Sequence, residues 1–236
     1  MALAVRCVSL ILILTFPLSI KASGNLLHEL PADERQEIFG KLNALQKSIN
    51  SIHASATQEK RLSAMKEEIR VEGMVVMAKP NLLRWDTARP QKSVTVTDGR
   101  TMTVYYPDIK EAQVYSLSEN IIARNTMSFF TTAMGGDLGD LKELEKRFTV
   151  NIFRSEDGLL FKLTPLSKMA GKYLASLVIK YDETTGLPKG FEVTTPKGDK
   201  TVTKLTDIKI NPEISPETFS IKLPDDAVIT NKFETD

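Results

Sequence analysis

The chain is poor in the residues that most often carry enzyme chemistry. Among its 236 residues are one cysteine, Cys7, and two histidines, His28 and His53. Neither histidine has a partner at metal-ligand spacing, so the sequence predicts no zinc site. The sequence also lacks a G-x-S-x-G elbow, an H-E-x-x-H pair and a glycine-rich loop that would cradle phosphate. We therefore expect no enzyme activity, no metal and no cofactor.

Carboxylates are plentiful, but most fall in turns or on polar faces. Asp86, next to the single tryptophan Trp85, is the best candidate for an acid. The alternative, which we favour, is that Asp86 forms an ion pair with nearby Arg84 or Arg89. We therefore assign no catalytic residue.

An excess of charge of one sign is also absent. Lys and Arg number 31 against 30 Asp and Glu, which gives a net charge of +1. Nucleic-acid binding requires a concentrated basic face, and no charged run stands out. We expect no nucleic-acid partner.

The first 22 residues have the pattern of a secretory signal. Arg6 is followed by an apolar run from Val8 to Ile20, and small residues follow at Ala22 and Ser23. The run is short for a membrane span, although an uncleaved anchor is the alternative interpretation. The pattern predicts export and cleavage.

Removal of residues 1–22 changes what can hold the chain together. Cys7 leaves with the signal, so no disulfide can form in the remaining chain. Arg6 and Lys21 leave as well: Lys and Arg fall from 31 to 29 against 30 Asp and Glu, and the net charge becomes −1. We expect residues 23–236 to form a single domain that depends on a hydrophobic core.

An amphipathic helix is predicted near the start of this domain. Asp33 opens it, with Gln36 three residues later as the partner in a capping box. Apolar residues then recur with the helical period, at Ile38, Leu42, Leu45, Ile49 and Ile52. We expect the helix to pack one face onto an apolar surface.

From Ser55 to Asp86 the apolar period changes to two, which is typical of strands. One face of the central run carries Ile69, Val71, Gly73, Val75 and Met77. Further strands are predicted at Ser93–Thr97, Thr101–Tyr106, Phe148–Ser155, Leu159–Thr164, Tyr173–Asp182, Gly190–Thr195 and Thr201–Asn211. Turn signals separate them at Asp98-Gly99, Asp157-Gly158, Thr185-Gly186 and Lys197-Gly198. About eleven strands in all predict a mainly β chain with helices, built as a barrel, a half-barrel or a sandwich.

One segment, Ile121 to Phe148, interrupts the period of two. Its first part is apolar and ends at Gly135-Gly136, a helix stop. Asp140, with Glu143 three residues later, then starts a second short helix. An apolar insertion of this kind is a plug, a lid or a dimer arm, and an ordinary core helix is the alternative.

Trp85 lies in a segment that begins with a strand-breaking residue. Pro80 cannot donate to a sheet ladder, so it marks a strand start, an edge or a bulge. Beyond it, alternation places Leu83 and Trp85 on one face. Trp85 then faces either the interior of a barrel or an ordinary packed core.

The order of several short motifs resembles the LolA family of periplasmic carriers of outer-membrane lipoproteins. The likeness runs from about Phe39 to Pro224. It is carried by Ile52–Gln58, Lys79–Asp86 (KPNLLRWD), Thr97–Gly99 (TDG), Tyr105–Pro107 (YYP), Ala112–Tyr115 (AQVY) and Phe219–Pro224.

The resemblance implies a fold and a function. The fold is an unclosed antiparallel β-barrel, with the amphipathic helix and a helical lid over a hydrophobic cavity. The function is that of a monomeric periplasmic carrier, which takes lipoprotein acyl chains from an inner-membrane lipoprotein-releasing transporter to an outer-membrane acceptor. Two alternatives stay open: a similar binding protein for another lipid, such as a glycolipid or polyketide lipid, and a regulatory module that senses lipoproteins.

The resemblance and the alternation together indicate site residues. We expect the cavity to be lined by Val75, Met77, Leu83, Trp85, Tyr105 and Tyr115, and by Ile122, Met127, Phe129 and Phe130 of the lid. The family position that holds the empty cavity shut corresponds to Lys79. Arginine is the commonest family residue there, and lysine has fewer donors, so we expect a weaker latch.

Overall fold

One long sheet makes up most of the molecule. The computed structural model describes residues 27–119, 124 and 140–230. Within them, thirteen strands pair in the order β1-β8-β9-β10-β11-β12-β2-β3-β4-β5-β6-β7-β13. The strands are β1 (His28–Glu29), β2 (Ser51–Arg61), β3 (Ile69–Ala78), β4 (Leu82–Arg89), β5 (Ser93–Thr97), β6 (Thr101–Tyr106), β7 (Glu111–Ser116), β8 (Phe148–Ser155), β9 (Gly158–Pro165), β10 (Ser176–Tyr181), β11 (Pro188–Thr194), β12 (Lys200–Ile210) and β13 (Val228–Thr230).

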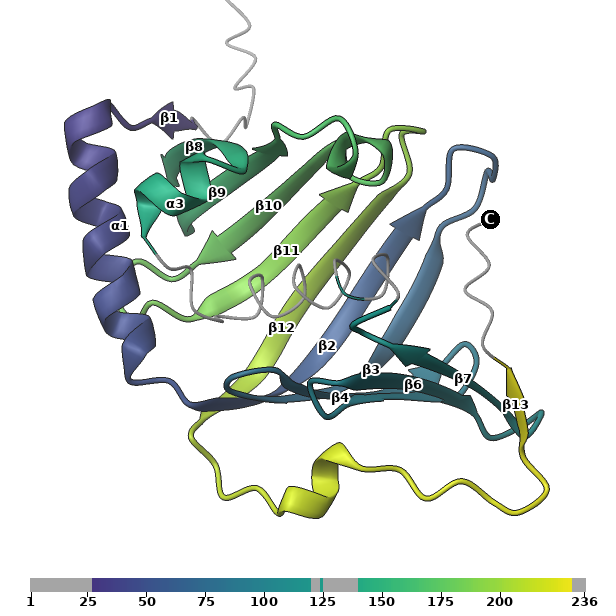
Figure 1. Ribbon diagram of the computed structural model, residues 1–236. Coiled ribbons are helices and arrows are strands. Elements are labelled where there is room, and N and C mark those ends of the chain that lie inside the picture. The colour runs from purple at the N-terminus through teal and green to yellow at the C-terminus, as the bar shows by residue number, and fades with distance from the viewer. Residues whose placement is uncertain (1–26, 120–123, 125–139, 231–236) are drawn as a thin grey trace, which may run out of the picture.

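The sheet is antiparallel and unclosed, as the resemblance to the LolA family implies. The exception to the antiparallel pairing is β13, which runs parallel to β7. The count exceeds the expected eleven because β1 and β13 are edge strands of two and three residues, too short to show a period. Figure 1 shows the sheet bent, with β4, β6 and β7 turned out of the plane of β8 to β12.

Helix α1 (Ala32–Lys47) packs against one end of the concave side. The Phe39 and Phe161 rings lie 6.1 Å apart, and Arg35 Nη1 donates to the Val150 carbonyl at 2.8 Å. Gly186, with φ of +70°, lets the β10–β11 turn approach the helix, since a Cβ there would lie 2.7 Å from Leu45 Cβ. The helix therefore closes the end of the sheet where β10 turns into β11.

Both predicted ends of this helix were misplaced. The helix begins one residue before Asp33, and its N-cap is Pro31, without a side-chain capping bond. It ends at Lys47, so Ile49 lies beyond it and Ile52 belongs to β2. The apolar series continued across the boundary because Ile49 and Ile52 face the same core as the helix, and burial alone does not distinguish helix from strand.

A single asparagine fixes the corner between α1 and β2. Asn211 Oδ1 accepts hydrogen bonds from the backbone N–H groups of Asn50 at 2.7 Å and Ser51 at 3.1 Å. Its Nδ2 donates to the Ser48 carbonyl at 2.8 Å. The last carbonyls of a helix have no partners inside the helix, so this side chain satisfies one of them.

The shorter elements largely follow the predictions. Helix α3 (Leu141–Glu145) is capped by Asp140, whose side chain accepts from Lys142 N. The predicted strand at Tyr173 is too long, because the 3-10 turn η1 (Ala170–Lys172) precedes β10, which begins at Ser176. Past the 3-10 turn η2 (Pro216–Phe219), the chain runs along the outside to β13 (Figure 1).

Some expectations fall outside the described residues. These are the signal at residues 1–22 and the lid residues Ile122, Met127, Phe129 and Phe130. In the part of the chain that the structure describes, no helix is long and apolar enough to span a membrane.

Candidate functional site

Strand register brings five of the six predicted cavity residues that the structure describes onto one face of the sheet. Leu83 on β4 lies opposite Met77 on β3, and Trp85 lies opposite Val75. The series continues across β5 and β6 to Tyr115 on β7. All five side chains are buried, and Trp85 is 7% exposed.

The same face continues through the other half of the sheet. Register pairs Ala54 on β2 with Val75, and Ala56 on β2 with Leu205 on β12. We use the term inner face for the buried apolar residues of this surface: Val150, Ile152, Leu159, Phe161, Leu163, Leu177, Ile179, Phe191, Leu205, Ile52, Ala54, Ala56, Val75, Met77, Leu83, Trp85, Met102 and Tyr115. They form one contiguous cluster, so the concave side of the sheet is an apolar surface from β8 to β7.

Polar side chains interrupt the apolar surface at two of its middle strands, β2 and β12. Gln58 on β2 and Thr203 on β12 are buried and lie opposite each other. Gln58 Nε2 donates to Thr203 Oγ1 at 3.1 Å. Lys60 follows two residues after Gln58, so alternation places it on the same face. We call Gln58, Lys60, Thr201 and Thr203 the polar patch.

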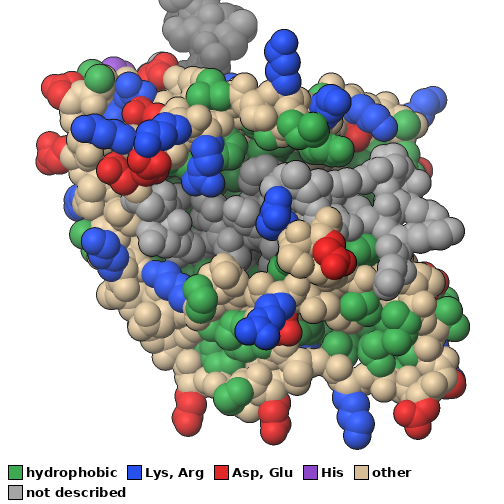
Figure 2. Space-filling view, viewed as in Figure 1, with side chains coloured by type: hydrophobic (Ala, Val, Ile, Leu, Met, Phe, Trp, Pro, Cys, Tyr) green, Lys and Arg blue, Asp and Glu red, His purple; other side chains and the backbone are tan. Residues whose placement is uncertain are grey.

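The opposite face of the same strands carries ion pairs. Glu72 pairs with Arg70 at 3.0 Å and with Arg89 at 2.6 Å, and Lys204 pairs with Glu59 at 3.6 Å. These side chains are partly exposed, so this side of the sheet is in contact with solvent. We call the side of β2, β3 and β12 that carries these ion pairs the outer face. Seen from the concave side, Figure 2 also shows hydrophobic side chains at the surface along the upper and lower borders.

Tyr105 does not join the inner face. Register places it opposite Val94 on β5 and Ala112 on β7, whereas the neighbours of Trp85 across the same strands are Thr95 and then Val104. Tyr105 therefore lies on the other side of the sheet from Trp85. Tyr105 was expected to line the same cavity as Trp85, but the pairing of β5 with β6 directs its side chain to the opposite face.

Lys79 has a hydrogen-bond partner in helix α1 that the resemblance did not imply. Its Nζ donates to the Gln46 carbonyl at 2.9 Å, in the last turn of α1. A cation is favourable at this end of a helix, where carbonyls lack partners and the dipole is negative. Lys79 thus ties β3 to α1, and residues 121–134, which it was expected to hold, lie largely outside the described residues.

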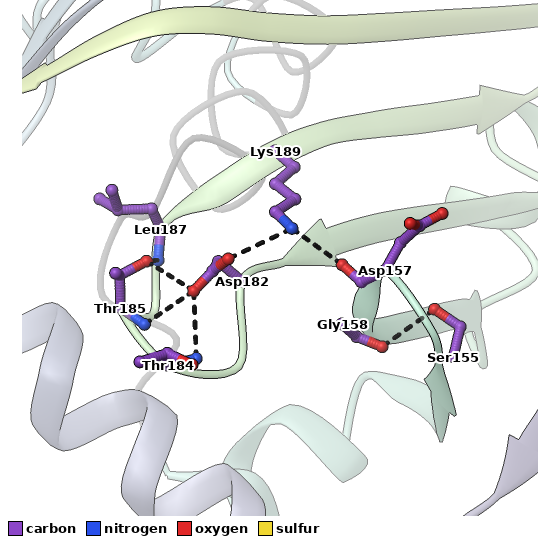
Figure 3. A network of polar contacts seen from close by, with 8 residues as sticks. All are labelled: Ser155, Asp157, Gly158, Asp182, Thr184, Thr185, Leu187 and Lys189. Carbon is purple, nitrogen blue, oxygen red and sulfur yellow. Dashed lines mark hydrogen bonds and ion pairs between the residues drawn. The ribbon is translucent and has the colours of Figure 1, made fainter.

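The turn beneath α1 is held by a network around Asp182 (Figure 3). Asp182 Oδ1 accepts from the backbone of Thr184 at 3.1 Å and from the backbone and hydroxyl of Thr185, both at 2.9 Å. Lys189 Nζ lies 3.2 Å from Asp182 Oδ2 and donates to the Asp157 carbonyl at 2.9 Å. The Thr185 donors, more than Lys189, lower the pKa of Asp182 to about 2.

Asp86 takes the role we favoured from sequence. Arg84 Nε donates to its carboxylate at 2.7 Å, and Arg84 Nη1 donates to the Thr218 carbonyl at 3.3 Å. The pair therefore attaches the C-terminal segment to β4. Among the described residues, no group of three or more His, Cys, Asp or Glu side chains is arranged to hold a metal ion.

A comparison with protein families decides the identity of this fold. The model of the outer membrane lipoprotein carrier protein LolA matches residues 47–222. The chain belongs to the LolA family. A curated relative from Vibrio vulnificus, named outer-membrane lipoprotein carrier protein, is 30% identical over 151 residues, which cover 64% of this chain and 69% of the relative.

Two further comparisons cover more of the chain. A relative of the same name from Chromohalobacter salexigens is 23% identical over 187 residues, covering 79% of this chain and 83% of the relative. The crystal structure of an uncharacterized conserved protein from Thermus thermophilus superposes with a TM-score of 0.51 at 13% identity, over 84% of this chain and 99% of that one. The structural likeness concerns the fold alone.

Sequence reasoning missed the polar patch of this LolA-family sheet. Gln58 and Lys60 continue the even-numbered apolar series Ile52, Ala54 and Ala56 of one strand. A polar residue that keeps the parity of a buried series is the signal that would have found them. It was missed because the predicted strand was started at Ser55, which left the parity of residues 52–54 unused.

Proposed function

We propose that the protein is a periplasmic carrier that holds the acyl chains of outer-membrane lipoproteins against the inner face. The observation that carries this proposal is membership of the LolA family, whose matched segment includes β2 to β7 and β8 to β12. The apolar, contiguous inner face supports it, because a carrier of acyl chains needs such a surface.

The physical requirement is a shielded apolar surface. Exposing an acyl chain to water costs about 0.8 kcal/mol per CH₂, so a lipoprotein cannot leave a membrane without a partner that covers its chains. Apolar side chains on a concave sheet provide that cover without covalent chemistry. Release then requires only that an acceptor offers a better apolar environment.

The exchange partners belong to the same proposal. An inner-membrane lipoprotein-releasing transporter would load the carrier, and an outer-membrane lipoprotein acceptor would unload it. We also retain residues 121–134 as a lid whose Ile122, Met127, Phe129 and Phe130 contact the acyl chains. Secretion by the predicted signal at residues 1–22 would place the carrier in the periplasm.

Complex formation with an acylated and a non-acylated form of one lipoprotein tests this function. The mature protein is mixed with each form after detergent removal, and the products are separated by size-exclusion chromatography. We expect a soluble one-to-one complex with the acylated form alone. Equal co-elution of both forms, or aggregation of the acylated form despite excess carrier, contradicts the proposal.

A further inference from the structure

Lys60 is a charged residue on an otherwise uncharged stretch of the concave side. It lies opposite Ile69 on β3 and Thr201 on β12. In the regularly paired parts of β12, β2 and β3, the other positions of this face carry apolar, glycine, glutamine or threonine side chains. Lys60 is the only charged side chain among them.

The described residues give Lys60 neither an ion pair nor a hydrogen bond, which separates it from nearby lysines. On the outer face, Lys200 pairs with Glu192 at 2.8 Å and Lys204 pairs with Glu59. Lys60 is half-buried, and burial lowers its pKa from the ordinary value. A desolvated ammonium without an acceptor gains more from an added anion than a solvated one does.

Donors and acceptors around Lys60 form a small polar surface. The Thr201 hydroxyl belongs to the residue directly opposite Lys60, and the hydrogen-bonded Gln58 and Thr203 lie one step further along the same two strands. An ammonium beside a hydroxyl offers two donors to one oxygen-rich group. The hydrogen-bonded Gln58–Thr203 pair lies between this polar surface and the apolar residues Ala56 and Leu205 of the inner face.

The polar patch lies toward the end of the sheet away from α1. The helix leads into the start of β2 at Ser51, whereas Lys60 is nine residues further, roughly 30 Å along an extended strand. At that end the β9–β10 connection exposes Leu166, Met169 and Tyr173, which are 57%, 56% and 46% exposed. Apolar chains lying along the inner face toward α1 would leave the head of the ligand at Lys60.

We propose that Lys60 and Thr201 bind the anionic head of an amphiphile whose acyl chains lie along the inner face. The ligand class is an acyl compound with a carboxylate or phosphate oxygen next to its chains. This inference rests on the proposed function, because it assumes that the inner face receives acyl chains. It adds selectivity at one end: the apolar surface holds the chains, and Lys60 selects the charge of the head.

Three sixteen-carbon probes separate head recognition from chain binding. Hexadecanol is neutral, hexadecanoate carries a carboxylate, and hexadecyl phosphate carries a phosphate. Each of the three compounds is titrated against a neutral fluorescent acyl probe bound to the parent protein. The concentration of each compound is kept below the point at which that compound aggregates. We expect both anions to bind roughly ten-fold more tightly than hexadecanol, as one charge-assisted hydrogen bond provides. The tighter of the two anions identifies the head as phosphate or carboxylate.

Variants locate the effect at Lys60. Lys60→Met keeps the length and apolar stem of the side chain, and should bring the three affinities within about two-fold of one another. Lys60→Arg should keep the preference for anions, and Thr201→Val should reduce it. Lys204→Met removes a lysine from the outer face of β12 and should leave the preference for anions unchanged. Circular dichroism checks that every variant is folded.

The outcomes distinguish this inference from the carrier function. If Lys60→Met keeps the parent's preference for anions, or if the parent has none while binding hexadecanol, the inference is wrong and the apolar carrier stands. If none of the three probes displaces the fluorescent ligand, both fail. The inference is supported if Lys60→Met loses the preference for anions while Lys60→Arg and Lys204→Met keep it.

Discussion

Alternate residues of strand β2 point to opposite faces of the sheet, and the two faces have different surroundings. On the inner face Ile52, Ala54 and Ala56 are at most 3% exposed. On the outer face Glu59 pairs with Lys204 across to β12, and both side chains are partly exposed. Along β2, a single layer of backbone thus separates an apolar surface from a solvated one.

The comparison shows how one strand contributes to both a stable core and a solvated surface. Burying an aliphatic side chain contributes about 1.5–3 kcal/mol, whereas an exposed ion pair contributes about 0–1 kcal/mol. The inner face therefore provides most of the stability and, by our proposal, the ligand surface. The ion pairs of the outer face occupy the solvated side of the same strands.

The largest difference between the faces should come from truncating a buried leucine. Leu83 is 2% exposed on the inner face, and Leu83→Ala should lower the free energy of unfolding by about 2–4 kcal/mol. The outer-face variant Arg70→Ala is the matched control, and should change it by less than about 1 kcal/mol. Urea unfolding followed by circular dichroism measures both. Similar losses in the two variants would remove the distinction between the faces.

A smaller effect is expected where α1 is tied to the end of the inner face. Lys79→Ala removes the hydrogen bond to the Gln46 carbonyl and should cost about 1–2 kcal/mol, with increased amide exchange in the last turn of α1. Lys79→Arg retains a charged donor and should restore most of that loss. If the alanine variant exchanges at the parent rate, the bond does not hold the helix.

The turn that supports α1 should make stability depend on pH. The pKa of Asp182 is lowered to about 2 from an ordinary 3.8, so its carboxylate stabilises the folded state above about pH 4. That contribution is lost as the pH falls from 4 toward 2. Asp182→Asn should therefore be less stable than the parent at pH 6, and the difference should shrink between pH 4 and pH 2.

The control for Asp182 comes from the same network. Asp157 contacts Lys189 through its backbone carbonyl, so Asp157→Asn leaves that hydrogen bond in place. Thermal unfolding is measured from pH 6 to pH 2. The difference in unfolding temperature between Asp157→Asn and the parent should not change comparably over this range. If the difference in unfolding temperature between Asp182→Asn and the parent stays constant from pH 6 to pH 2, the Asp182 carboxylate does not stabilise the turn as described.

The smallest effect should appear on the outer face. The atoms that join Glu59 and Lys204 lie 3.6 Å apart, and the Lys204 side chain is 65% exposed. A double-mutant cycle with Glu59→Gln and Lys204→Met should give a coupling below about 0.5 kcal/mol that falls further in 0.5 M salt. A salt-independent coupling above 1 kcal/mol would show that the outer face is not simply solvated.

Sequence patterns predicted this fold where local rules dominate. The period of two and the glycine turns located the strands from Ser93 to Tyr106 with their observed ends, and Asp140 capped its helix as expected. For Lys79 and Tyr105 the sequence did not reveal the contact with α1 or the direction away from Trp85, for a shared reason. Their surroundings depend on long-range pairing, of α1 with β3 and of β5 with β6, which no local pattern records.

The most direct test of the account uses the single tryptophan of the inner face. Fatty acids brominated at different carbons quench a nearby indole, and Trp85 is the one tryptophan in the chain. Binding is measured independently by equilibrium dialysis. We predict saturable quenching by the brominated acids, deepest for bromine at one stretch of the chain, and none by the unbrominated acid. Saturated binding without quenching at any bromine position would contradict the claim that acyl chains lie on the inner face.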